Sequence, residues 1–97
     1  MNDDFLLDRV PDAAKRAGVC VSAYYAAAAD GLMPPVVKIG ARAAAVPRRE
    51  IEAVNAARIA GKTDGEVREL VKGMVADRTK RFLKLTGQLD DATRQAA

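Results

Sequence analysis

A run of basic side chains without an acidic neighbour is the feature of this sequence that could bind a ligand. Between residues 34 and 49 the cations are Lys38, Arg42, Arg48 and Arg49. Cations at this density attract the phosphates of a nucleic acid, because each contact releases condensed counterions. Lys15 and Arg16 add two cations earlier in the chain. The alternative for each of these residues is a solvated basic face.

The residue types needed for catalysis or metal binding are scarce. The chain has no His and one Cys, Cys20, which leaves out the commonest general base, the commonest zinc ligand and an internal disulfide. No carboxylate has a supporting base, and the sequence has no phosphate loop or cofactor fingerprint. We therefore expect no enzymatic activity, no cofactor and no metal. Cys20 is expected to be a small apolar filler.

The length limits what can position these cations. With 97 residues, the chain forms one small domain with room for an appended helix. Twenty of the residues are alanine, which favours helices but fills little core volume. The acidic start Met1-Asn2-Asp3-Asp4 is unlike a signal peptide, and no apolar run reaches the roughly 18–20 residues of a membrane span. We expect a cytoplasmic protein that does not contact a membrane.

Residues that typically begin or end helices predict two short helices joined by a tight turn. Pro11 suits a first helical turn and Gly18 the position after the last one. A second helix follows from Val21 and ends at Gly31, with Cys20 in its N-cap position. Such a pair is a candidate helix-turn-helix. Tyr24 and Tyr25 cannot both face inward, because neighbouring helical residues lie about 100° apart.

A hairpin and two further helices are predicted next. Strands over 36–39 and 43–46 flank a turn at 40–42, so Arg42 lies at the tip. A helix runs from Arg48 to Ile59, with Ile51, Val54 and Ile59 expected on its buried stripe. Thr63 and Glu66 form a capping box for a last helix that Gly87 ends. These boundaries define a flexible N-terminus (1–8), a domain (9–61), a C-terminal helix (62–86) and a flexible tail (87–97).

The last helix carries an apolar stripe and then a basic stretch. The stripe packs either on the domain or against a second protomer, and its residues are Val67, Leu70, Val71, Met74 and Val75. The basic stretch is either a solvated helix end or an additional phosphate clamp, formed by Arg78, Lys80, Arg81 and Lys84.

Five short motifs in the expected order resemble the AlpA-type regulators and excisionases of the MerR-like group. They cover residues 9 to about 60: Arg9-Val10-Pro11-Asp12, Gly18-Val19-Cys20-Val21-Ser22-Ala23-Tyr24-Tyr25, Gly31-Leu32-Met33-Pro34, Lys38-Ile39-Gly40-Ala41-Arg42 and Glu50-Ile51-Glu52-Ala53-Val54. Where the family carries arginines, this chain has Val21 and Ala26, so its second helix lacks basic side chains. Val46 and Val54 replace two family tryptophans and keep those positions apolar.

The resemblance implies a mainly α winged helix-turn-helix fold with a small β-hairpin wing and an extra C-terminal helix. It implies sequence-selective binding of double-stranded DNA, with Tyr24 buried, Tyr25 towards DNA and Ser22 at a helix end that attracts phosphates. The DNA-binding residues expected on these grounds are Ser22, Tyr25, Lys38, Arg42, Arg48, Arg49, Lys15 and Arg16.

The role implied is that of a recombination directionality factor, or excisionase, of a prophage or integrative element. Such a protein binds attachment-site DNA cooperatively, with a site-specific recombinase as a candidate partner and self-association along DNA through Val67, Leu70, Val71 and Met74. It would be a prokaryotic cytoplasmic protein, nucleoid-associated when bound. The alternatives are a transcriptional regulator at promoter DNA and a protein-interaction adaptor with weak DNA affinity.

Overall fold

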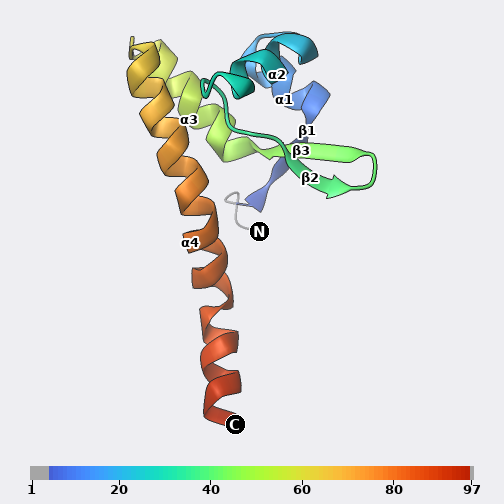
Figure 1. Cartoon of the computed structure of the whole chain (residues 1–97), viewed down its shortest axis with the longest axis vertical. Coiled ribbons are helices and arrows are strands. Elements are labelled where there is room, and N and C mark those ends of the chain that lie inside the picture. The colour runs from blue at the N-terminus through green and yellow to red at the C-terminus, as the bar shows by residue number, and fades with distance from the viewer. Residues whose placement is uncertain (1–4, 97) are drawn as a thin grey trace.

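In the part of the chain that the structure describes, a small antiparallel sheet lies beside four helices, with its hairpin projecting away from them (Figure 1). The computed structural model describes residues 5–96, with side chains described through Gly87. The elements in chain order are β1 (Leu7–Arg9), α1 (Val10–Ala17), α2 (Val21–Ala29), β2 (Val37–Gly40), β3 (Ala43–Pro47), α3 (Arg48–Ile59) and α4 (Asp64–Ala96). This mainly helical arrangement with a small sheet is compatible with a winged helix.

The predicted hairpin is present and has an additional neighbour. β2 and β3 pair across a two-residue turn, Ala41-Arg42, with Gly40 opposite Ala43. The third strand, β1, pairs with β3 on its other side, so the sheet order is β1-β3-β2. The prediction that residues 1–8 lack structure is therefore wrong at Leu7 and Asp8. Residues 1–4 lie outside the described part of the chain.

Glycines end the first three helices where the sequence predicted it. Gly18 has φ 78° and donates its N–H to the carbonyl of Lys15, which closes α1. Gly31 and Gly61 also have positive φ, 76° and 81°, just beyond α2 and α3. This left-handed conformation is the one that glycine adopts without a steric cost. α2 begins after Cys20, whose side chain makes no cap hydrogen bond.

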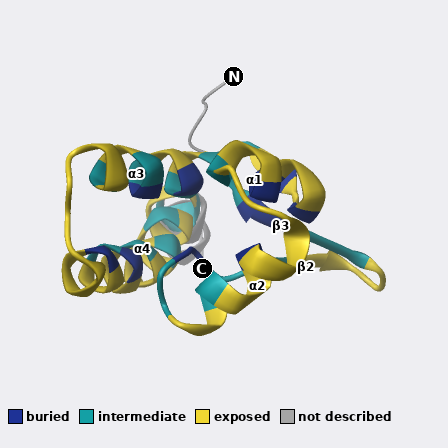
Figure 2. Ribbon diagram, turned by 90° about the horizontal axis from the view of Figure 1, so that it is seen from above, coloured by how far each residue is buried: buried dark blue, intermediate teal, exposed yellow. Residues whose placement is uncertain are grey.

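The core lies where the sheet, α1, α2 and α3 meet the first half of α4 (Figure 2). Tyr24 is fully buried, as predicted, and its hydroxyl donates to the carbonyl of Pro34 at 2.7 Å. Ile51 and Val54 are buried on α3, but the prediction for Ile59 is wrong, since it is 87% exposed. At about 100° per residue, Ile59 lies roughly 140° around the helix from Val54 and leaves the stripe.

α4 begins at the predicted capping box and runs further than predicted. The N–H of Glu66 donates to Thr63 Oγ1 at 3.2 Å, and the N–H of Thr63 donates to Glu66 Oε1 at 3.1 Å. The helix continues through Gly87 to Ala96, so the expected end at Gly87 is wrong. Glycine lowers helix stability by about 1 kcal/mol, but it ends a helix only where the backbone leaves helical geometry.

Most of the apolar stripe of α4 packs on the domain itself, whereas Val75 is 39% exposed. Val67 is fully buried and Val71 is 5% exposed, both within the core, and Met74 packs against its edge. The expectation that Val67 and Val71 mediate self-association is corrected by this burial, because a second protomer cannot reach them. Leu70 and Met74 are half-buried and keep some exposed surface.

Candidate nucleic-acid interface

The β2–β3 hairpin presents two cations that no described side chain neutralises. Lys38 lies on β2 and Arg42 in the turn at the tip, and both are exposed. Within residues 5–87 neither makes a hydrogen bond or an ion pair. The sheet positions them because β3 is paired on both sides, which fixes the base of the hairpin. The predicted tip position of Arg42 is confirmed, and its charge is free to meet an anion.

Helix α2 presents an exposed face without any charge. Its sequence from Val21 to Ala29 contains no acidic and no basic residue. Tyr24 anchors the inner side, while Tyr25 remains 47% exposed and Ser22 is exposed near the helix start. Both views place α2 and the hairpin on adjoining sides of the molecule (Figures 1 and 2). The structure thus brings Ser22 and Tyr25 together on α2.

Cys20, at the start of α2, is exposed, so the expectation of a buried filler is wrong. Its Sγ lies 3.4 Å from Ser22 Oγ. The hydrogen bond with Ser22, helped by backbone N–H groups at the helix start, lowers the pKa of the thiol. No described residue of the chain could form a disulfide with it, since it is the one cysteine.

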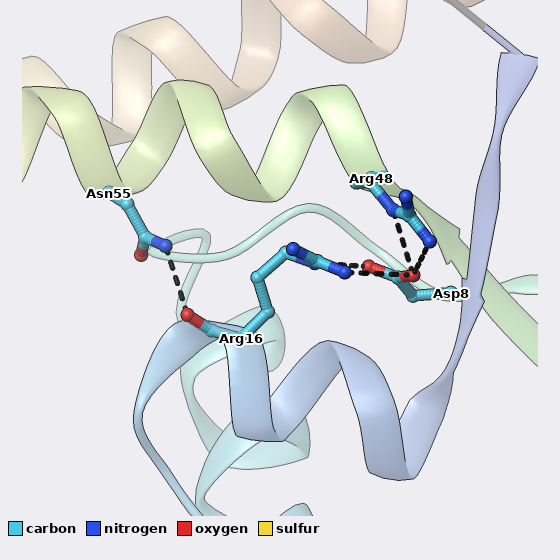
Figure 3. A network of polar contacts seen from close by, with 4 residues as sticks. All are labelled: Asp8, Arg16, Arg48 and Asn55. Atoms are coloured by element: carbon cyan, nitrogen blue, oxygen red, sulfur yellow. Dashed lines mark hydrogen bonds and ion pairs between the residues drawn. The ribbon is translucent and has the colours of Figure 1, made fainter. Parts of the chain in front are cut away.

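Arg16 and Arg48 are engaged by a buried carboxylate that the sequence did not single out (Figure 3). Asp8 on β1 is 3% exposed and accepts from Arg16 Nε at 2.6 Å. It also accepts from Arg48 Nε at 3.1 Å and Nη2 at 3.0 Å. Burial alone would raise the pKa of Asp8, but the hydrogen bonds and charges of the two guanidinium groups outweigh it and hold the pKa below 3.8.

The Asp8 network gives Arg16 and Arg48 a structural role, and their contact with DNA stays a prediction. Their guanidinium groups join β1, α1 and α3, and the hydrogen bond to Asp8 raises the pKa of Arg16. Asn55 reinforces the same junction by donating to the carbonyl of Arg16 at 3.0 Å. Both arginines therefore stabilise the fold by joining these three elements. The sequence feature that could have pointed to a buried carboxylate is the position of Asp8 directly after the apolar run Phe5-Leu6-Leu7.

The remaining predicted cations lie apart from the hairpin. Lys15 is exposed in the last turn of α1, and Arg49 is exposed in the first turn of α3. In Figure 2, α1 and α3 lie along the edge of the molecule opposite α2. Of the eight predicted residues, Arg16 and Arg48 meet at Asp8, with Lys15 and Arg49 on the same two helices, whereas Ser22 and Tyr25 lie on α2 and Lys38 and Arg42 on the hairpin.

One residue of the basic stretch of α4, Arg78, makes contacts that hold the fold together. Arg78 Nη2 lies 2.6 Å from Glu50 Oε1 and donates to the carbonyl of Pro35 at 2.8 Å. Arg78 therefore fastens α4 to α3 and to the loop before β2, whereas Lys80 and Lys84 remain exposed. Beside this contact, α4, α3 and the sheet enclose an apolar groove of about 430 Å³, whose lining includes Phe5, Leu7, Pro47, Met74 and Phe82.

Other classes of site are not found in the described part of the chain. Its Cys, Asp and Glu side chains form no group that could hold a metal ion, and none of its helices is long and apolar enough to cross a membrane. Comparison of the sequence and structure with protein-family models, curated proteins and solved structures finds no match.

Proposed function

We propose that this protein binds duplex DNA as a winged helix-turn-helix protein. α2 would lie in the major groove, and the hairpin would carry Arg42 to the backbone or into the adjoining minor groove. The observation that carries the proposal is the pairing of two unneutralised cations, Lys38 and Arg42, with the exposed helix beside them. The net charge of +3 favours the same ligand.

The biological role we infer is that of a recombination directionality factor of a mobile element, with a transcriptional regulator as the alternative. One module of this size makes few base contacts, so useful selectivity requires several copies side by side on DNA. Such copies could contact each other through surface that the core leaves exposed, such as Leu70 and Met74. A footprint separates the two roles, because one protects an attachment site and the other a promoter.

The test of DNA binding is a salt titration of Arg42→Ala on short random-sequence duplexes. Removing one phosphate contact should weaken binding and reduce the slope of log K against log salt by about one unit. Lys72→Ala removes an exposed cation of α4 that lies outside both predicted basic groups, so it is the matched control and should leave the slope unchanged. Equal slopes for the wild type and Arg42→Ala would remove the hairpin from the interface.

A protein-interaction adaptor is the second candidate, and the apolar groove beside α4 favours it. Phe5 is 50% and Phe82 60% exposed there, which is a large apolar surface for a small protein. The same salt titration separates the two functions, because an adaptor with weak DNA affinity would give the same shallow slope of log K against log salt for the wild type and Arg42→Ala.

A further inference from the structure

The outer face of α2 has a composition that limits what it can recognise. We call the exposed residues Val21, Ser22, Tyr25, Ala26 and Ala29 the α2 face. Val21 is 39% and Tyr25 47% exposed. Ser22, Ala26 and Ala29 follow the i, i+4, i+7 spacing that places them opposite the buried Tyr24. The face therefore presents methyl groups, one ring and two hydroxyls, and it presents no charged, amide or guanidinium group.

This chemistry matches one feature of the major groove. Guanine and adenine are read there by paired donors and acceptors on Arg, Lys, Asn or Gln, and cytosine by an acid. The α2 face has none of these side chains. The hydroxyls of Ser22 and Tyr25 can hydrogen-bond to more than one base, so they discriminate little between bases. The group that the apolar part of the face can distinguish is the 5-methyl group of thymine, which is read by apolar contact. The short side chains of Ala26 and Ala29 also let the helix backbone approach the base edges closely.

Resting on the proposed function, we infer that the α2 face selects duplex sites by apolar contact with thymine methyl groups. The charge around it favours DNA over an apolar protein partner. Lys38 and Arg42 are unneutralised within the described side chains, and α2 itself has no acid to repel phosphates. An apolar protein surface would cover the face but would provide no counter-charge for the hairpin.

The experiment removes the methyl groups and leaves every hydrogen-bonding group in place. Duplexes with a randomised centre are selected on the full-length protein, and the selected pool is then amplified with either dTTP or dUTP. The dUTP pool differs only by its missing 5-methyl groups. Burying one such carbon is worth about a fourfold change in affinity, so two contacts predict roughly fifteenfold weaker binding to the dUTP pool.

Two substitutions assign the effect to α2. Val21→Thr exchanges one exposed methyl for a hydroxyl with little change of shape, and Ala26→Ser adds a hydroxyl to an exposed methyl. Each should bring the affinity ratio of the two pools towards one. Arg42→Ala is the control, because it should weaken binding to both pools equally and leave their ratio unchanged. Thermal melting of each variant verifies that the fold is retained.

The possible outcomes are distinct. Equal binding of the dTTP and dUTP pools overturns the inference while the proposed DNA binding stands. A ratio that survives both α2 substitutions also overturns it, because the preference then arises elsewhere. Absence of salt-dependent binding to either pool overturns the proposed function and leaves a protein partner for the α2 face.

Discussion

Asp8→Asn tests whether the buried carboxylate holds β1, α1 and α3 together. The substitution keeps the size of the side chain but removes the charge that accepts three contacts of 2.6 to 3.1 Å. A hydrogen bond to a charged group contributes about 1.5–3 kcal/mol net. Arg16 and Arg48 are 37% and 38% exposed, so water replaces much of what they lose. We expect a loss of roughly 2 kcal/mol in the free energy of unfolding.

The assay is thermal melting over a range of pH. For a domain of this size, a loss of about 2 kcal/mol lowers Tm by roughly 8–16 °C. The pKa of Asp8 is below 3.8 in the folded protein, so the unfolded chain binds the proton first as the pH falls. The stability from Asp8 is therefore complete well above pH 3.8 and is lost as the pH falls through the folded pKa. The wild type and Asp8→Asn should converge there.

Asp12→Asn is the matched control for Asp8→Asn. It removes an exposed carboxylate from the first turn of α1, where the charge is worth only about 0.3–1 kcal/mol through the helix dipole. Equal Tm values for the two variants at neutral pH would refute the structural role of Asp8. A difference between the wild type and Asp8→Asn that persists unchanged in acid would refute the protonation argument.

Two further substitutions test the packing around the core. Tyr24→Phe removes the donor to the carbonyl of Pro34, so urea unfolding should show a loss of about 1–2 kcal/mol, and an unchanged midpoint would mean that water satisfies that carbonyl. Arg78→Ala should release the middle of α4 from Glu50, so amide exchange should accelerate after Met74 and stay slow at Val71; uniform acceleration would show instead that the whole domain is destabilised.

The elements that the sequence predicted well are those set by local interactions. Gly18 ends α1 because only a few neighbouring residues decide that geometry, and the Thr63–Glu66 capping box is likewise contained within four residues. The hairpin was predictable because Pro34 and Pro35 exclude a helix before it. The position of Arg42 followed from these local signals alone.

The parts that were missed depend on contacts between distant residues. β1 is three residues long and exists because β3, almost forty residues later, pairs with it. Asp8 falls in the segment predicted to be flexible, because its partners Arg16 and Arg48 lie 8 and 40 residues away in the sequence. The periodicity of α4 identified the apolar side of the helix, but it could not show whether that side meets the domain or a second protomer. The ion pair of Arg78 with Glu50 could not be predicted either, because the two residues are distant in the sequence.

The core is closed by residues from both flanks of the segment that first looks like the domain. A fragment spanning 9–61 would omit Asp8 and would leave Arg16 and Arg48 without their shared acceptor. It would also omit Val67 and Val71 and uncover the core that they complete. Residues 8–78 are the shortest stretch that retains these contacts together with the Arg78 ion pair, and residues 7–78 also keep β1 whole. Expression fragments, fusion junctions and protease-resistant products should therefore respect these limits.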